Sequence, residues 1–369
     1  KKKNLNKIKK INWIKEYPAL ISLTKGYEYS YNKKNLKKFK KNSSFRIIGM
    51  GGSILGAESI YHFLKHKINK NFIFINNLSH KLKNHEKKTK AINIIISKSG
   101  NTLETIINSN LLINKSKNLF ITENNNNYLI NLAKDLKAEI FEHKNYIGGR
   151  YSVLSEVGML PAELMGLNEK KFKRFNYLIE NKYFINTLIE NVILIINQIK
   201  QGKTNSVILN YDEKSDNLFK WYQQLTAESL GKNGKGIFPI VSSMPKDNHS
   251  LLQLYLDGPK NNFYTFFSVR EKNSQKLNNS NLFGKYSILK NKNIYKILDS
   301  QKKATENIFR RKKIPFRSFE IINRSEETLG ELFCFFILET ILLGHLLKVN
   351  PFNQPEVELI KRETKKILI

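Results

Sequence analysis

Short apolar runs alternate with amphipathic stretches along the first half of the chain. The runs predict strands at residues 45–48, 71–75, 91–96 and 118–122. The stretches that follow the first and third runs have the spacing of helices. Strands that alternate with helices are typical of a parallel sheet, because each parallel connection needs a crossover segment.

The same alternation returns in the second half. Apolar runs predict strands at 206–210 and 263–269, and helices are expected at 221–230 and, fully buried, at 331–347. A long helical stretch over residues 169–201 separates the two halves. The expected fold class is therefore α/β, with two parallel sheets flanked by helices.

Chain length supports two units, because single hydrophobic cores stop growing near ~250–300 residues. The chain has 369 residues. Residues 272–293 are polar and predict an exposed loop. The predicted division is a helical N-terminal extension (1–42), a first domain (43–168), a connecting helix (169–200), a second domain (201–349) and a C-terminal arm (350–369).

Composition excludes several classes of protein. With 40% hydrophobic and 25% charged residues, the profile is globular and not disordered. The single cysteine, Cys334, lies in an apolar run, which predicts a buried packing residue in a reducing cytoplasm. No membrane span is expected, because the apolar run at 332–347 is interrupted by Glu339 and His345 and is shorter than the ~20 residues that a bilayer requires.

The formal net charge is +32, which favours anionic partners. Nucleic acid is one such partner, but its binding sites concentrate positive charge in one patch or motif. Here the lysines are spread over the whole length among Asn and Ile, as an AT-rich genome would encode. The spread favours a compositional origin and makes a nucleic-acid partner the weaker interpretation.

A glycine-rich loop follows the first predicted strand. Gly49 and Gly51 fit the start of a dinucleotide fingerprint, but Ile54 replaces its third glycine and the next strand ends without an acidic residue. The loop still leads into a helix N-terminus, where free N–H groups attract anions. We expect Gly52 and Ser53 to contact a phosphorylated sugar.

A second polar loop follows the third predicted strand. Ser97, Lys98, Ser99 and Thr102 place hydroxyls and a cation around Gly100. Such groups at a strand-to-helix turn suit a phosphate monoester, although an ordinary Ser/Thr helix cap would look the same in isolation. Ligands in open α/β sheets bind at the carboxyl ends of strands, where both loops lie.

Five segments resemble the glucose-6-phosphate isomerase family and occur in that family's order. The match runs from about residue 48 to residue 361, and Asn353 and Glu356 depart from it where aspartate and glycine are usual. The resemblance implies two sugar-isomerase (SIS) type domains and a homodimer whose active site takes a histidine from the neighbouring chain. The matching segments are 97–105, 148–155, 223–229, 247–250 and 350–361.

The implied reaction interconverts glucose 6-phosphate and fructose 6-phosphate, a step of glycolysis and gluconeogenesis. It moves a proton between adjacent carbons, for which a carboxylate is a suitable base, and Glu228 is the candidate. Arg150 is the candidate cation beside the enediolate. His249, with Lys361, is expected to open the sugar ring.

Two glutamines complete the predicted site. Gln224 and Gln354 are expected to contact hydroxyl or phosphate groups. Proton transfer through a carboxylate needs no cofactor and no metal. His62 and His66 have a spacing that can bind metal, but no further ligands accompany them, so a solvated helix face is the favoured interpretation.

Three alternatives remain open. A sugar-phosphate sensor would keep the polar loop at residues 97–102 (the hydroxyl loop) and would not need Glu228 as a base. A nucleic-acid-binding protein would bind with a steep salt dependence. The third alternative is an isomerase that also accepts mannose 6-phosphate, a substrate that differs from glucose 6-phosphate only in its configuration at C2.

Overall fold

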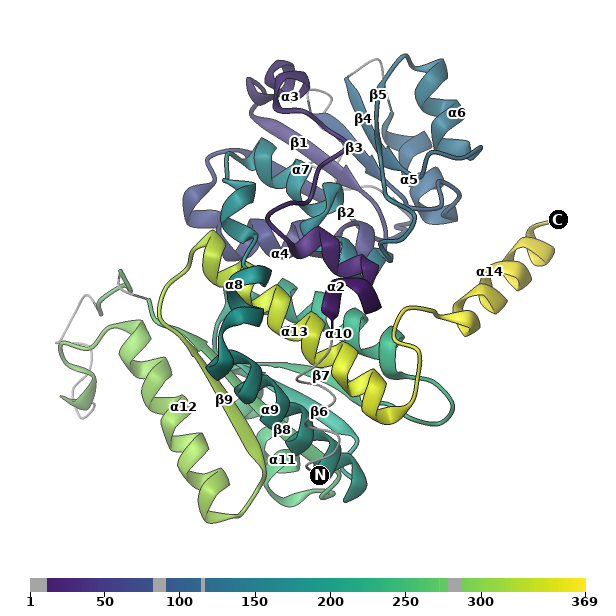
Figure 1. The fold of residues 1–369 in the computed structure, drawn as a ribbon. Helices are drawn as coiled ribbons and strands as arrows, with labels where there is room; N and C mark the ends of the chain where they lie inside the picture. The colour runs from purple at the N-terminus through teal and green to yellow at the C-terminus, as the bar shows by residue number, and fades with distance from the viewer. Residues whose placement is uncertain (1–11, 82–90, 114–116, 272, 278–286) are drawn as a thin grey trace.

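The structure is a computed structural model that describes residues 12–81, 91–113, 117–271, 273–277 and 287–369. Two parallel sheets lie one above the other, and helices cover their faces (Figure 1). Part of the polar loop predicted at 272–293 lies outside the described residues.

The first sheet has five strands in the order β2-β1-β3-β4-β5, and every neighbouring pair is parallel. Because β1 pairs with both β2 and β3, the winding reverses at β1, and the crevice between the ends of β1 and β3 is the position at which open α/β sheets bind ligands. The strands are β1 (Ser44–Ile48), β2 (Asn71–Ile75), β3 (Ile92–Ile96), β4 (Asn118–Thr122) and β5 (Glu139–Glu142). Their helices are α4 (Leu55–Phe63), α5 (Leu103–Leu112), α6 (Tyr128–Asp135) and α7 (Glu156–Met165).

The second sheet repeats this topology with the order β7-β6-β8-β9. Its first strand again pairs with two neighbours in parallel. The strands are β6 (Asn205–Asn210), β7 (Phe238–Ser243), β8 (Asn262–Val269) and β9 (Phe316–Ile321). The helices are α10 (Asp216–Leu230), α11 (Leu252–Asp257), α12 (Ile294–Arg311) and α13 (Glu326–Leu347). The predicted α/β class is confirmed.

The single helix predicted over 169–201 is wrong. The chain forms a 3₁₀ turn, η5 (Glu169–Phe172), and two helices, α8 (Phe175–Glu180) and α9 (Lys182–Lys200). Asn181 causes the second break, because its backbone is extended and its side chain accepts a hydrogen bond from the N–H of Phe184. An asparagine that caps a helix in this way starts a new one.

The described part of the N-terminal extension is also helical in short pieces. It contains α2 (Trp13–Glu16), a 3₁₀ helix η1 (Pro18–Leu23) and α3 (Lys33–Lys40). Leu20 and Leu23 are buried in the core, whereas most lysines of α3 face solvent. The extension is therefore packed onto the first domain and keeps a basic outer face.

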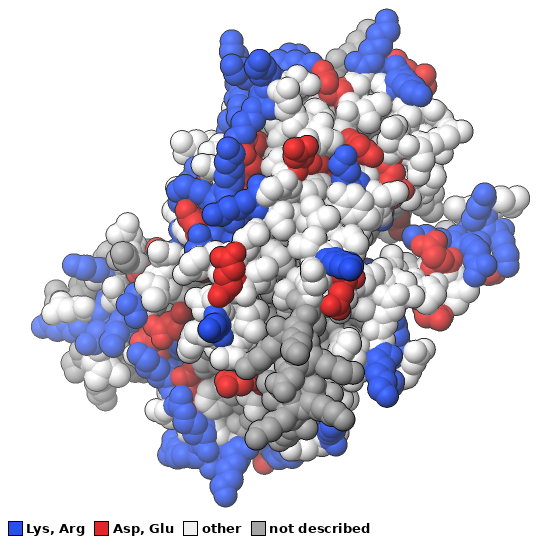
Figure 2. Space-filling view, viewed as in Figure 1, with Lys and Arg blue, Asp and Glu red and all other residues white. Residues whose placement is uncertain are grey.

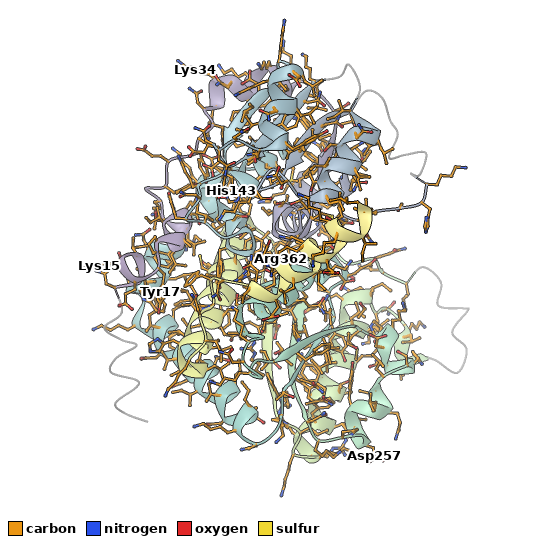
Figure 3. All side chains as sticks on the ribbon, turned by 90° about the vertical axis from the view of Figure 1, so that its right-hand side faces the viewer. Lys15, Tyr17, Lys34, His143, Asp257 and Arg362 are labelled. Carbon is orange, nitrogen blue, oxygen red and sulfur yellow. The ribbon has the colours of Figure 1, made fainter. Side chains whose placement is uncertain are left out.

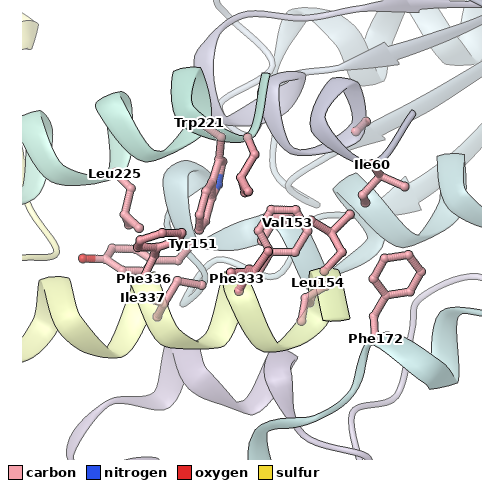
Figure 4. Close-up of a cluster of buried hydrophobic side chains, with 14 of the residues drawn as sticks. Ile60, Tyr151, Val153, Leu154, Phe172, Trp221, Leu225, Phe333, Phe336 and Ile337 are labelled. Atoms are coloured by element: carbon pink, nitrogen blue, oxygen red, sulfur yellow. The ribbon is translucent and has the colours of Figure 1, made fainter. Parts of the chain in front are cut away.

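Helix α13 lies between the two sheets and contributes a long run of buried side chains to the shared core (Figures 1 and 4). Trp221 packs edge-on against Phe333 with ring centroids 4.8 Å apart, and Cys334 is buried as predicted. The helix starts at Glu326, earlier than expected, so it is long and apolar enough to cross a membrane by length and composition alone. Its most apolar window is 83% buried inside the protein, which is the environment of a core helix.

A buried ion pair ties α13 to the second sheet. Both nitrogens of the Arg317 fork donate to the Glu339 carboxylate, the Nη2–Oε1 distance being 3.1 Å, and Glu339 is fully buried. Removing one partner of such a pair leaves an uncompensated charge, so Glu339→Leu should lower the free energy of unfolding by about 3–5 kcal/mol. Chemical denaturation measures the change.

The exposed pair Arg270–Glu320 is the matched control, because both side chains are about half exposed (50% and 42%). Glu320→Leu should change the stability by less than ~1 kcal/mol. The double substitution Arg317→Met with Glu339→Leu should recover much of the loss. Equal effects of the buried and the exposed single substitutions would contradict the assignment.

Candidate active site

A cavity of about 540 Å³ opens at the carboxyl ends of β1 and β3. Its walls also come from the segment after β5, from α10 and from the C-terminal arm. All but two of the predicted site residues line it. They are Gly52, Ser53, Lys98, Ser99, Thr102, Arg150, Gln224, Glu228, Gln354 and Lys361.

The glycine loop brings the other walls of the cavity together. A Cβ atom on Gly52 would lie 2.2 Å from the carbonyl carbon of Gly149, so the two loops touch backbone to backbone. Gly51 has a φ of +52°, which favours glycine, and its Cβ would meet Gln224 Nε2 at 2.6 Å. Larger residues here would push Arg150 and Gln224 away from the loop.

The hydroxyl loop ends at the N-terminus of α5. Thr102 is the N-cap, and its side chain makes no capping bond to the helix, so the first N–H groups of α5 stay available to an anion. Ser97 is buried, and its Oγ lies 2.9 Å from Thr102 Oγ1, behind the cavity wall. Ser97 therefore orients Thr102, while Ser99 and Thr102 line the cavity.

Lys98, which follows β3, contacts residues that follow β4 and β5. Its Nζ donates to the carbonyl oxygen of Asn145 at 2.7 Å and lies 3.5 Å from Glu123 Oε1. Both partners fix the ammonium group beside the hydroxyls. The cavity thus presents a positioned positive charge next to a helix N-terminus, and the two together favour a phosphate group.

Arg150 is buried, with its side chain only 2% exposed, and every N–H of its guanidinium has a partner within the chain. These contacts connect the segment after β5, the end of α10 and the C-terminal arm. The acceptors are Ser229 Oγ (2.8 Å from Nε), Glu228 Oε2 (3.0 Å) and Gln354 Oε1 (2.6 Å) from Nη1, and the carbonyl oxygens of Pro351 (2.6 Å) and Asn353 (3.1 Å) from Nη2.

The Glu228 carboxylate is held at both oxygens. Oε2 accepts the Arg150 bond, and Oε1 accepts a bond from Gln224 Nε2 at 2.8 Å. The side chain is 28% exposed and lines the cavity. Glu228 is thus a fixed carboxylate with access to a ligand, and such a group can take up or return a proton.

Three neighbours of this pair were not predicted from the sequence. The Tyr151 hydroxyl lies 2.9 Å from Ser229 Oγ and donates to the Pro351 carbonyl at 2.9 Å, which fixes the acceptor of Arg150 Nε. Lys232 Nζ donates to the carbonyls of Ser229 and Asn350, and burial together with the charge of Arg150 lowers its pKa to about 8. Tyr151 and Ser229 adjoin Arg150 and Glu228 in the sequence, and Lys232 follows Glu228 by four residues; this proximity is the signal that could have indicated them.

The C-terminal arm ends in α14 (Pro355–Leu368), which has no buried residue and projects from the body (Figure 1). Figure 3 shows it from the side, with Arg362 labelled. Lys361 on this helix donates to Glu358 Oε1 at 2.6 Å, and both residues line the cavity. Glu358 is a further cavity residue that the sequence did not indicate.

His249 does not line this cavity. It is exposed at the end of η7 (Lys246–His249), a 3₁₀ turn that follows β7 in the second domain. Asp247 in the same turn accepts bonds from the Ser242 hydroxyl (2.8 Å) and the Ser250 hydroxyl (3.0 Å), which fix the turn. The imidazole therefore sits on the surface of a well-anchored loop.

Comparison with known proteins agrees with this geometry. The family model described as phosphoglucose isomerase matches residues 33–369. A glucose-6-phosphate isomerase from Methanocaldococcus jannaschii is 32% identical over 388 residues, which cover 97% of this chain and 94% of the relative. A glucose-6-phosphate isomerase from Mycoplasmopsis pulmonis is 32% identical over 362 residues, covering 87% of this chain and 82% of the relative.

Solved structures share the fold. A glucose-6-phosphate isomerase from Chlamydia trachomatis superposes with a TM-score of 0.75 at 17% identity, covering 91% of this chain and 72% of that one. A hypothetical protein from Thermus thermophilus reaches 0.84 at 20% identity and covers 100% and 94% of the two chains. At these sequence identities, the comparison shows a shared fold.

The close backbone contact between Gly52 and Gly149 can be tested by substitution. Gly52→Ala should force the loops apart, lower the stability by about 1–3 kcal/mol and reduce the activity. Gly149→Ala is the matched control, because a Cβ at Gly149 meets no atom within 4 Å. Thermal unfolding compares the two variants, and equal midpoints would contradict the packing argument.

Proposed function

Because the chain belongs to the phosphoglucose isomerase family, we propose that Glu228, Arg150 and the two polar loops carry out the reaction of that family in the cavity between β1 and β3. The protein is an aldose–ketose isomerase that interconverts glucose 6-phosphate and fructose 6-phosphate. One observation carries the residue assignment. The Glu228 carboxylate, which lies 3.0 Å from Arg150 Nη1, lines the same cavity as the polar loop at residues 97–102.

The phosphate group of the substrate binds at the N-terminus of α5. Ser99 and Thr102 donate their hydroxyls, the free N–H groups of the first helical turn donate theirs, and Lys98 supplies charge. Ser53 and the backbone at Gly52 contact the substrate from the other loop. These roles are supported by the shared cavity wall.

Glu228 acts as the base. It removes the C2 proton of the open-chain aldose, the electron pair shifts to the carbonyl carbon and oxygen, and a cis-enediolate forms. A proton also passes from the hydroxyl on C2 to the oxygen on C1, and return of the abstracted proton to C1 then gives the ketose, so that one carboxylate serves both half-reactions without net consumption of protons. Gln224 orients the carboxylate and, with Gln354, contacts the substrate hydroxyls.

Arg150 acts through its charge and through the groups that it holds. Since all of its N–H groups already have acceptors in the chain, it offers the enediolate a fixed positive field and does not need a free donor. The same bonds keep the Glu228 carboxylate aligned. A neutral side chain of similar size would supply neither effect.

Ring opening uses groups outside the rigid part of the site. Lys361 reaches the cavity from α14, and His249 comes from the neighbouring chain of a homodimer. The exposure of His249 on the surface of its own chain supports this arrangement. We place the enzyme in the cytoplasm, and we take residues 43–168 and 201–349 as its two sugar-isomerase domains.

Glu228→Gln is expected to keep the fold and the bond to Arg150 while it removes the base. Turnover should fall by about 10²–10⁴-fold, because that is the usual contribution of a positioned acid or base. A coupled assay for glucose 6-phosphate formed from fructose 6-phosphate measures it. Glu104→Gln, a cavity carboxylate in the first turn of α5, should retain activity within about tenfold; similar losses in both variants would remove Glu228 from its role.

A shared active site predicts complementation between two inactive variants. Glu228→Gln and His249→Ala should each be nearly inactive alone. In an equal mixture of refolded or co-expressed chains, half of the dimers are mixed and each has one intact site, which restores about a quarter of the wild-type activity. No recovery, with mixed dimers demonstrated by mass, would show that His249 does not serve a neighbouring chain.

A further inference from the structure

A second cavity lies at the amino ends of β6, β8 and β9, where the strands of the second sheet begin. Its volume is about 330 Å³, and four lysines surround it: Lys203, Lys260, Lys312 and Lys313. This group is termed the lysine pocket. Because ligands of the family's reaction bind at the carboxyl ends of the first sheet, the lysine pocket is separate from the site described above.

The charges of the lysine pocket are uncompensated. No aspartate or glutamate is among the residues that line it. Within the described part of the chain, none of its ammonium groups forms an ion pair: Lys203 bonds only to the Gln201 side chain (3.0 Å) and Lys260 only to the Leu256 carbonyl (3.3 Å). Several lysines around one cavity without a counter-charge create a positive potential that an anion relieves.

The substrate cavity is a useful contrast, because its cations are all paired. Lys98 lies beside Glu123, Arg150 beside Glu228 and Lys361 beside Glu358. The high net charge of the chain therefore does not by itself leave cavities without acids. The lysine pocket differs from the substrate cavity in having cations alone.

The floor of the lysine pocket is built from buried polar groups. Tyr264 is 2% exposed, and its hydroxyl donates to the Tyr255 carbonyl at 3.2 Å and accepts from Asn262 Nδ2 at 3.1 Å. Asn262 in turn accepts a bond from Asn205 Nδ2 at 2.9 Å. These bonds fix the floor in the absence of a ligand, so the cavity is preformed.

One of the lysines occupies a backbone position that favours glycine. Lys313 follows the C-cap of α12 and has a φ of +55°. Glycine or asparagine is preferred there, since a side chain is strained in this conformation. Figure 2 shows Lys and Arg atoms gathered over the C-terminal end of α12, at the lower edge of the molecule.

We propose that the lysine pocket binds a compact polyanion, a small molecule with a polyphosphate group or more than one phosphate group. The volume is at the lower end of the range for small-molecule sites. The lining comes from α11, from the start of β8 and from the loops that precede β6, β8 and β9, and a site of this size suits a small molecule better than a nucleic-acid strand. Pro259, Ile314 and Pro315 add an apolar wall for the uncharged part of the ligand.

Inorganic tripolyphosphate is the probe, titrated calorimetrically into the full-length protein at 150 mM salt. Saturating fructose 6-phosphate occupies the substrate cavity, so that only binding elsewhere is detected. Wild type should bind about one equivalent per chain, and Lys312→Gln with Lys313→Gln should weaken the binding by at least ~10-fold. Lys203→Gln with Lys260→Gln should weaken it similarly from the other side of the pocket.

The matched control is Lys34→Gln with Lys37→Gln on α3, two exposed lysines without ion pairs among the described residues. It removes the same charge and should leave the affinity within about twofold, because only distant screening changes. All variants should keep wild-type isomerase activity and thermal midpoints.

Three results would overturn the proposal. Wild type could show no saturable binding once fructose 6-phosphate is present. The control pair could weaken binding as much as the pocket pairs, which would indicate net charge and not a site. A single-stranded oligonucleotide could bind more tightly than tripolyphosphate with the same dependence on Lys312 and Lys313, which would identify a nucleic-acid surface.

Discussion

The buried guanidinium of Arg150 is the interaction on which the site depends. An arginine removed from water requires both an opposite charge and acceptors for all of its N–H groups. Glu228 provides the charge, and four further acceptors come from α10 and the C-terminal arm. Because the cost of leaving any of these groups unpaired is high, three segments that are far apart in sequence are fixed relative to each other.

Glycine makes this arrangement sterically possible. The Arg150 segment can approach the first sheet closely only because Gly52 offers no side chain to Gly149. Gly100 serves the hydroxyl loop in the same way: its φ is +66°, and a Cβ would lie 1.9 Å from Asn127 Oδ1. Glu228 and the loop at residues 97–102 therefore line one cavity because glycine allows close approach at both places.

The sequence predicted the strands whose central residues form a continuous apolar run. Strands β2 and β4 were located to the residue because their apolar runs are continuous and bounded by polar residues. Strands β5, β7 and β9 were missed because partly exposed or polar positions interrupt their hydrophobic pattern. In the site, loop composition indicated Ser99 and Thr102, but only three dimensions reveal that Ser97 turns its hydroxyl to Thr102 or that Ser229 and Tyr151 support Arg150.

The attachment of the C-terminal arm has an evolutionary consequence. Arg150, Tyr151 and Lys232 hold residues 350–353 by main-chain carbonyl oxygens, which every amino acid possesses. Asn353, where aspartate is usual, contributes to Arg150 through its backbone and so loses nothing by the exchange. An anchor of this kind tolerates exchange of the side chains at 351 and 353, whereas Gln354, which accepts from Arg150 through its side-chain oxygen, is the position of the arm at which the side chain matters.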